Sequence, residues 1–149
     1  MTDPLKPNAG VFLMGNEAIV RGALEAGVQM ATGYPGTPSS EIIETLARSA
    51  RPGQLYVEWS VNETVAMEVA AAASLAQLRS LCVMKENGVN VASDFLLHLT
   101  IAGTRGGLCW LPATTRAGYR ASRRGNPVSW HASWRSPCWS RQASRRPRT

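Results

Sequence analysis

Residues 55–84 read LYVEWSVNETVAMEVAAAASLAQLRSLCVM, and this stretch decides the fold. It begins with a largely apolar run at 55–59, continues through an alanine-rich segment with helical composition, and ends with a second apolar run at 80–84. The two runs do not alternate regularly between polar and apolar residues, as strands covered on both faces usually do not. The stretch therefore predicts a strand, a helix and a second strand in one parallel sheet.

The same alternation of strand and helix continues on both sides of this unit. We predict strands at 11–14, 28–32, 55–59, 80–84 and 108–111, and helices at about 17–26, 41–49, 60–78 and 91–102. Gly27 is placed to end the first helix, and Thr37 with Pro38 to begin the second. Ser60 and Glu63 match a capping box for the third helix. The predicted fold class is α/β: three layers, with a mostly parallel five-stranded sheet between helices.

The composition changes abruptly near residue 112. Up to that residue the chain carries all 10 acidic residues and seven of its 16 Lys and Arg, a net charge of −3. The remainder carries nine Arg, no Lys and no acidic residue, together with much Ser and Trp. We therefore divide the chain into a short N-terminus at 1–9 that we expect to be disordered, an α/β segment at 10–111, and an Arg/Ser/Trp-rich tail at 112–149 that we also expect to be disordered.

This division changes what the overall net charge of +6 implies. The positive charge belongs to the tail, so it does not make the α/β segment a nucleic-acid binder. The 3 cysteines have neither CxxC spacing nor an even number, which argues against zinc, iron–sulfur and disulfide frameworks. There is no signal peptide and no apolar run of membrane-spanning length, so we expect a cytoplasmic protein without a membrane partner.

Polar loops at 34–40, 58–63 and 85–90 follow three of the predicted strands. Parallel sheets bind ligands beyond the carboxyl ends of their strands, so these loops are expected to share one rim that forms the site. The chain lacks GxGxxG after its first strand and has no Walker-type loop, which disfavours dinucleotide and nucleoside triphosphate binding. Asp94 and His98 are four residues apart, but with no third ligand nearby we interpret them as a local polar pair and predict no metal site.

Four motifs in these segments resemble one known family. They are GNEA at 15–18, GYPGTPSS at 33–40, EWSVNE at 58–63, and MKENGVNVASD at 84–94. Together, in this order and from about residue 10 to residue 111, they resemble the large subunit of indolepyruvate:ferredoxin oxidoreductase. That enzyme is one of the thiamin-diphosphate-dependent 2-oxoacid:ferredoxin oxidoreductases. The resemblance implies that the segment is an incomplete N-terminal pyrimidine-binding domain of a thiamin enzyme.

The resemblance also implies a chemistry. Such enzymes decarboxylate aryl 2-oxoacids oxidatively, with CoA as acyl acceptor and ferredoxin as electron acceptor. A carboxyl group hydrogen-bonded to the pyrimidine ring of the cofactor promotes removal of the thiazolium C2 proton. Glu63 matches the family's glutamate for this role, although its place in a capping box offers a purely structural alternative. Glu58 is the other carboxylate of the motif, within the predicted strand.

The remaining cofactor-binding residues are expected in the flanking loops. Tyr34, Pro35 and Thr37 match the loop that approaches the thiazolium and the substrate in the family. The residues expected on the pyrimidine or substrate side are Lys85, Asn87 and Asn90. The implied partners are a diphosphate-binding domain that shares the cofactor, and a second subunit. Ligands for Mg²⁺ and for iron–sulfur clusters are expected in those parts, so we do not expect this chain to be active alone.

The resemblance suggests an origin for the tail. After the strand at 108–111 the family continues with Asp-Asp-Pro-Gly and then Ser-Ser. A GC-rich coding of residues 113–121, read from its third base, yields Asp-Asp-Pro-Gly-Gly-Leu-Ser-Ser, which indicates a frameshift and a truncated chain. Two alternatives remain open: the pyrimidine-binding half of another 2-oxoacid oxidoreductase or decarboxylase, and a non-catalytic module whose basic arm contacts nucleic acid. We expect no nucleic-acid partner.

Overall fold

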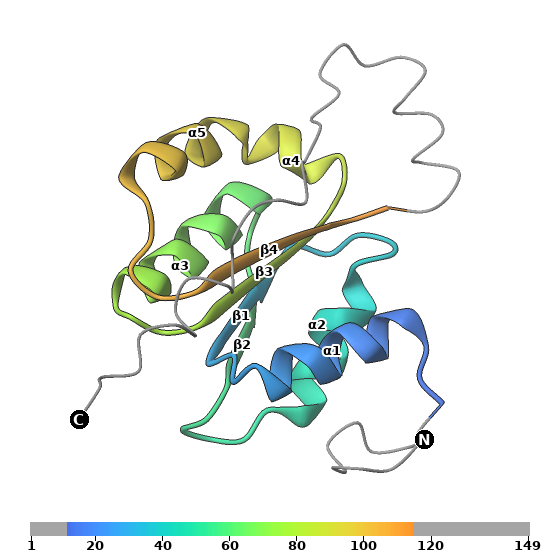
Figure 1. Ribbon diagram of the computed structural model, residues 1–149. Coiled ribbons are helices and arrows are strands. Elements are labelled where there is room, and N and C mark those ends of the chain that lie inside the picture. The colour runs from blue at the N-terminus through green and yellow to red at the C-terminus, as the bar shows by residue number, and fades with distance from the viewer. Residues whose placement is uncertain (1–11, 115–149) are drawn as a thin grey trace, which may run out of the picture. The chain divides into compact units, whose positions relative to one another are not determined.

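The computed structural model describes residues 12–114, which form an α/β unit (Figure 1). Four strands alternate with helices along this part of the chain. In chain order the elements are α1 (Gly15–Glu25), β1 (Met30–Gly33), α2 (Ser40–Ser49), β2 (Tyr56–Trp59), α3 (Glu63–Leu75), β3 (Ser80–Lys85), α4 (Gly88–Val91), α5 (Ser93–Ala102) and β4 (Leu108–Ala113). The predicted boundary at residue 112 is wrong by two residues, because Pro112 and Ala113 belong to β4. The N-terminus at 1–9 and the tail from residue 115 lie outside the described residues, so their disorder and the origin of the tail remain predictions.

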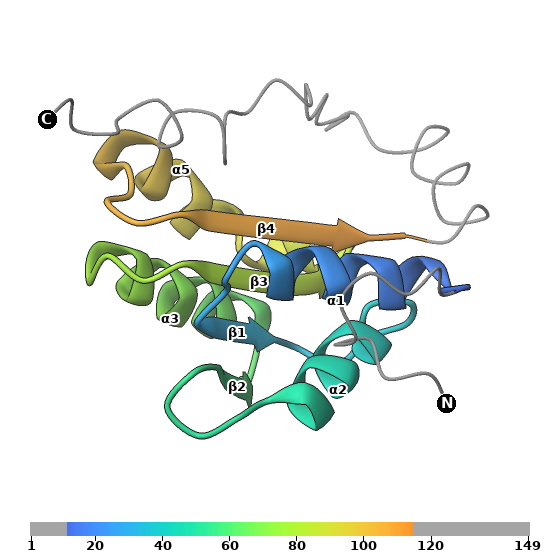
Figure 2. The same ribbon diagram turned by 60° about the horizontal axis from the view of Figure 1, so that its bottom comes forward.

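All strand pairs of the described sheet are parallel, in the order β2-β1-β3-β4. The chain moves from β1 outward to β2, then crosses back over β1 to β3. This reversal places α1 and α2 on one face of the sheet and α3, α4 and α5 on the other (Figures 1 and 2). The three-layer α/β fold class is therefore confirmed, with a switch in winding direction between β1 and β3.

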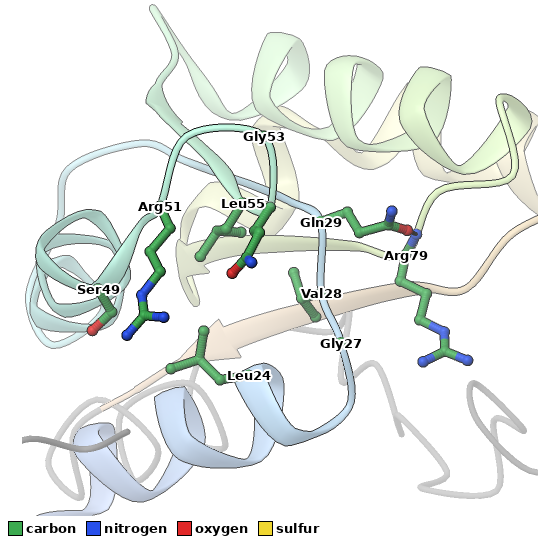
Figure 3. Close-up of a pocket in the computed structure, with 10 residues that line it drawn as sticks. Leu24, Gly27, Val28, Gln29, Ser49, Arg51, Gly53, Leu55 and Arg79 are labelled. Atoms are coloured by element: carbon green, nitrogen blue, oxygen red, sulfur yellow. Dashed lines mark hydrogen bonds between the residues drawn. The ribbon is translucent and has the colours of Figure 1, made fainter. Parts of the chain in front are cut away.

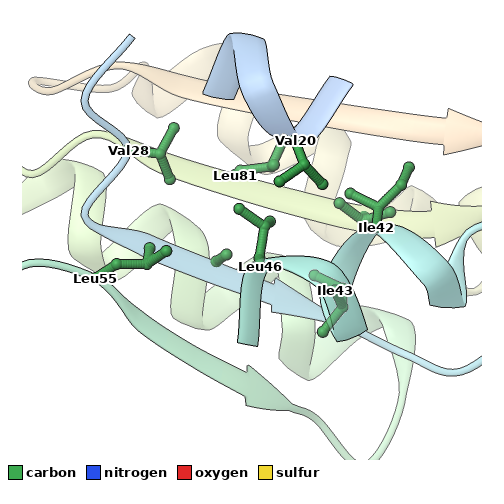
Figure 4. Close-up of a cluster of buried hydrophobic side chains, with 9 residues drawn as sticks. Val20, Val28, Ile42, Ile43, Leu46, Leu55 and Leu81 are labelled. Atoms are coloured by element: carbon green, nitrogen blue, oxygen red, sulfur yellow. The ribbon is translucent and has the colours of Figure 1, made fainter. Parts of the chain in front are cut away.

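Each face of the sheet has its own hydrophobic core. On one face Val20 of α1 and three residues of α2 (Ile42, Ile43 and Leu46) are fully buried against β1 and β3 (Figure 4). On the other face Ala66, Met67 and Ala70 of α3 pack over Cys82 and Met84 of β3. Small alanine side chains let α3 lie close to the sheet, and this burial of apolar surface is the main source of stability.

The predicted strand at 11–14 is wrong over the residues that the structure describes. Residues 12–14 form no strand, Phe12 is 98% exposed, and the described sheet has four strands rather than five. Met14 is instead the N-cap of α1, and its backbone N–H donates to Glu17 Oε2 at 2.9 Å. A short apolar run forms a strand only where a sheet edge can receive its backbone hydrogen bonds. Here the helix cap uses that backbone.

The helix ends follow local rules in some places and depart from them in others. Gly27 ends α1 with φ of 70°, as predicted for a residue in the left-handed region. The predicted start of α2 at Thr37 is wrong, because the N-cap is Ser39 and the helix begins at Ser40. Gly36 explains the shift. Its carbonyl accepts the N–H groups of Ser39 and Ser40, so a turn precedes the helix.

Helix α5 leaves apolar side chains exposed. No residue of α5 is buried, and Leu97 and Ile101 are 54% and 87% exposed. The small residues of α3 are mostly covered by the sheet and by α5. None of the helices within residues 12–114 is long and apolar enough to cross a membrane.

Candidate functional site

The three predicted loops do follow neighbouring strand ends. In register, Gly33 at the end of β1 pairs with Trp59 at the end of β2 and with Val83 of β3. The loops at 34–40, 58–63 and 85–90 therefore leave the same edge of the sheet, as predicted. The reversal of winding between β1 and β3 lies in the middle of this rim, where doubly wound sheets characteristically bind ligands.

Two glycines let the loops after β1 and β3 come together. A Cβ atom on Gly36 would lie 2.9 Å from Lys85 Cδ and 3.3 Å from its Cβ and Cγ, so the aliphatic part of Lys85 crosses the glycine. A Cβ on Gly33 would lie 2.8 Å from the backbone oxygen of Val83. These contacts bring the half-buried Lys85 against the 34–40 loop, and they bring together two of the segments predicted to share a site.

Glu63 is the first residue of α3, and its side chain is free of any helix-capping role. The predicted capping box between Ser60 and Glu63 is wrong, because the N-cap of α3 is Asn62, whose Oδ1 accepts the N–H of Val65 at 2.8 Å. Ser60 extends the strand instead, donating its N–H to the carbonyl of Gly33 at 2.9 Å. The structural alternative for Glu63 that the sequence left open is thereby removed.

The Glu63 side chain is buried in the rim with only 5% of its surface exposed. Its carboxylate has no hydrogen-bond partner among residues 12–114. Gly88 lies directly against it, and its charge acts on the thiol of Cys82. The Glu63 oxygens are not among the enclosed polar atoms without a partner, so the carboxyl group keeps access to the rim, where a ligand can form a hydrogen bond with it.

The other predicted cofactor residues surround this rim at its surface. Tyr34 is half-buried, whereas Pro35 and Thr37 are exposed in the loop after β1. Asn87 is the N-cap of α4 without a side-chain capping bond, and Asn90 is exposed on that short helix. Their roles in binding stay predictions, and Glu63 is the only one of the seven predicted site residues that the structure buries.

The carboxylates outside this rim have different environments. Glu58 lies on β2, the edge strand, where it accepts the hydroxyl of Tyr56 at 3.0 Å and raises the pKa of that phenol. Asp94 and His98 form an exposed local pair, with 4.0 Å between carboxylate and imidazole. This agrees with the sequence interpretation, and residues 12–114 contain no cluster of three potential metal-ligating side chains.

The structure adds residues that sequence reasoning missed. Asn16 of α1 donates to the carbonyl of Pro38 at 3.1 Å and to Glu41 Oε2 at 2.7 Å, and so ties α1 to the loop after β1. Gly36 and Gly88 allow the close contacts with Lys85 and Glu63. The glycines within the loops were a visible signal, because a glycine between polar residues often marks a close approach. The partner of each glycine was not visible.

A hollow of about 640 Å³ lies at the opposite edge of the sheet, where β1 and β2 begin (Figure 3). Leu24, Val28 and Leu55 contribute its apolar lining, Arg51 and Arg79 are among its polar residues, and no acidic residue lines it. It contains none of the predicted site residues. Because the predicted site residues lie at the other edge of the sheet, we take the rim around Glu63 as the candidate site.

We predict that the Cys82 thiol stays protonated in the native chain well above pH 9. Burial is the main cause and raises its pKa to about 12, with a smaller increase from the charge of Glu63 and an opposing hydrogen bond from Thr32. The unfolded thiol ionises first, with a pKa near 9.0, so its contribution to stability is complete below pH 9 and is lost as pH rises toward 12. Alkylation rates against pH, native and in urea, measure this in a chain whose other cysteines are serine. Rapid native alkylation at pH 9 would contradict it.

The chain is similar in sequence to known oxidoreductase subunits. It is 50% identical over 103 residues to the indolepyruvate oxidoreductase subunit IorA of Methanothermobacter marburgensis, a match that covers 69% of this chain and 17% of the relative. It is 52% identical over 107 residues to IorA of Archaeoglobus fulgidus, again covering 69% and 17%. The 2-oxoglutarate synthase subunit KorA of Methanocaldococcus jannaschii is 31% identical over 84 residues, covering 56% of this chain and 23% of that subunit.

A solved structure has the same fold. The 2-oxoglutarate:ferredoxin oxidoreductase from Magnetococcus marinus, solved with 2-oxoglutarate, coenzyme A and succinyl-CoA bound, matches with a TM-score of 0.63 at 19% identity. The match covers 72% of this chain and 19% of that chain. No protein-family model matches the sequence. The matched part thus corresponds to less than a fifth of the length of the IorA relatives and of the solved chain.

Proposed function

The aligned part of this chain belongs to the family of the indolepyruvate oxidoreductase subunit IorA, and from that premise we propose that it forms the pyrimidine-binding side of a thiamin diphosphate site. The observation that carries the proposal is the largely buried side chain of Glu63 at the start of α3, which lies against Gly88 of the segment after β3. A neutral carboxyl group can donate its O–H to a pyrimidine ring nitrogen, and the carboxylate can accept the N–H of the protonated ring.

The residues of the rim fit this cofactor in chemistry as well as in position. When bound, thiamin diphosphate supplies a carbon nucleophile for attack on the 2-oxo group of a substrate. The Glu63 carboxyl holds the proton at the pyrimidine ring, and its side chain is 5% exposed, so few water molecules compete with the ring. The 34–40 loop, with Tyr34, Pro35 and Thr37, borders the same rim. It is the candidate for contacts with the substrate and the rest of the cofactor.

The proposed reaction of the complete enzyme is the oxidative decarboxylation of an aryl 2-oxoacid, with CoA and ferredoxin as acceptors. The aryl substrate is favoured because identity to the indolepyruvate subunits is 50%, against 31% to a 2-oxoglutarate subunit. The diphosphate group, its Mg²⁺ and the iron–sulfur clusters need ligands from other parts, since residues 12–114 offer no metal-ligating cluster. A diphosphate-binding domain and a second subunit are the proposed partners.

A segment exchange tests this proposal. The aligned residues of the full-length IorA subunit of Archaeoglobus fulgidus are replaced by those of this chain, and the subunit is assembled with its partner. We expect aryl 2-oxoacid-dependent ferredoxin reduction within about tenfold of the unmodified enzyme, a difference of about 1.4 kcal/mol in transition-state free energy.

The internal control of the segment exchange is that ferredoxin reduction depends on added thiamin diphosphate. The comparison substrate is 2-oxoglutarate. Activity with 2-oxoglutarate alone would overturn the aryl assignment. A folded, assembled chimera that neither binds the cofactor nor turns over any 2-oxoacid would overturn the proposed function itself.

A further inference from the structure

The contact between Gly88 and Glu63 is the closest approach of a side chain to any glycine of the described residues. A Cβ atom built on Gly88 would lie 2.5 Å from Glu63 Cγ, 2.6 Å from Oε1 and 2.9 Å from Cδ. Real Cβ atoms do not come this close to another heavy atom, so the space that a side chain at position 88 needs is occupied by the Glu63 carboxyl group.

The backbone at Gly88 is held in place independently of Glu63. Gly88 is buried and begins α4, and its carbonyl accepts the N–H of Ala92 at 3.1 Å. Further along this segment the carbonyl of Val91 accepts the hydroxyl of Thr64, the residue after Glu63, at 2.9 Å. The start of α3 and the segment at 88–92 are therefore fixed to each other by a bond that does not involve the carboxylate.

The backbone conformation of Gly88 does not itself require glycine. Positive φ values occur at Gly27, Gly53 and Gly103, and Gly88 is not among them. Alanine is also a better helix former than glycine. The obstacle to a larger residue at position 88 is thus the side chain of Glu63, which is movable, and no backbone atom lies among the nearest contacts.

We propose that Gly88 is a positioning residue for Glu63: its missing side chain leaves the space that the Glu63 carboxyl group occupies beside the start of α4. This inference rests on the proposed function, in which that carboxyl group contacts the pyrimidine ring. Any side chain at position 88 displaces the carboxyl group from its place. Because the displaced group is the end of a side chain rather than backbone, the fold survives the change and the chemistry does not.

The test compares Gly88→Ala with Gly22→Ala in the assembled segment-exchange enzyme described above, in which the full-length subunit carries the residues of this chain and thiamin diphosphate is bound. Gly22 is a helical glycine whose added Cβ would meet nothing within 4 Å, so it controls for the change of residue type. The readout is hydrogen–deuterium exchange at the thiazolium C2 atom. We expect Gly88→Ala to lower the exchange rate by about 10- to 100-fold, as a displacement of about 1 Å can do, and Gly22→Ala to leave it unchanged.

Epistasis with Glu63→Gln separates positioning from other roles of Gly88. If Gly88 acts through the carboxyl group, Gly88→Ala causes no further loss in the Glu63→Gln enzyme. A further loss of the same size would overturn the inference, because Gly88 would then act independently of Glu63. Wild-type exchange in Gly88→Ala would overturn it too. Wild-type exchange in Glu63→Gln alone would instead contradict the proposed function.

A second pair of variants covers the case in which Gly88→Ala does not fold. Thermal unfolding gives the Tm of two variants of the 149-residue chain. One carries Gly88→Ala alone, and the other carries both Gly88→Ala and Glu63→Ala. Removing Cγ, Cδ and Oε1 of Glu63 removes all three close contacts, so any loss of Tm caused by Gly88→Ala should be recovered in the double variant. A Tm that stays low in the double variant would show that the glycine serves the backbone, and the inference would fail.

Discussion

Replacing Gly106 by alanine is expected to destabilise the chain by about 1–3 kcal/mol, the cost typical of adding a methyl group to a well-packed site. The new Cβ would lie 2.3 Å from the carbonyl oxygen of Leu78 and 3.0 Å from that of Ser74. The same contact holds two hydrogen bonds: Gly106 donates its N–H to the Ser74 carbonyl at 2.7 Å, and the Ser74 hydroxyl donates to the Gly106 carbonyl at 2.9 Å.

The obstacle at Gly106 is backbone, so it cannot rotate away as a side chain can. The loop before β4 must separate from the end of α3, and buried Ser74 then loses its hydrogen-bond partner. Urea unfolding of the 149-residue chain, followed by circular dichroism, measures the effect. Gly22→Ala is the matched control and is expected to be neutral or to stabilise by up to about 1 kcal/mol. Equal stability of the two variants would contradict the packing at this loop.

The layered α/β fold could be predicted because periodicity and parallel-strand chemistry are local signals. Residues 80–84 are continuously buried in β3, as an apolar run between two helices requires. The shared rim followed from the same prediction, since parallel strands end at one edge. The strand predicted at 11–14 failed for a non-local reason, because a strand needs a neighbour and residues 12–14 pair with no strand of the described sheet.

The helix starts show where local rules compete with each other. Both Ser60 and Asn62 are good N-cap residues, and the sequence pattern Ser60 to Glu63 favoured the first. In the structure Ser60 continues the hydrogen bonding of β2 with β1, which moves the cap to Asn62. One strand bond thus decides that Glu63 is not part of a cap. A single sequence cannot reveal that choice.

The environment of Glu63 could not be predicted, because its neighbours come from distant parts of the chain. Gly88 and Cys82 meet it only after β3 has crossed back beside β1. The resemblance of the motif pointed to Glu63, and its role stays a prediction. The structure adds burial, the absence of a partner within residues 12–114, and the tight contact on one side.

Glu63→Gln is expected to lower the rate of thiazolium C2 exchange by about 100- to 10,000-fold in the assembled enzyme with bound thiamin diphosphate, the range typical for loss of an acid–base group. An amide has nearly the shape of a carboxyl group, so packing against Gly88 is retained. It cannot exchange a proton with the pyrimidine ring as a carboxyl group can. The fold should be retained as well, since Asn62 rather than Glu63 caps α3.

The control for this variant is Glu58→Gln. Glu58 belongs to the same sequence motif, but its carboxylate pairs with Tyr56 on the edge strand. We expect the rate of thiazolium C2 exchange in Glu58→Gln to stay close to that of the parent enzyme. A loss in Glu58→Gln equal to that in Glu63→Gln would mean that the variants act through a general disturbance of the rim.

Deuterium exchange at C2 of bound thiamin diphosphate, compared between the parent enzyme and Glu63→Gln at equal cofactor saturation, tests the central claim most directly. A loss of at least about 100-fold, with unchanged Tm, is the result expected if the buried carboxyl group acts on the cofactor. A rate in Glu63→Gln equal to that of the parent would contradict the claim that this rim is the pyrimidine-binding side of a thiamin site.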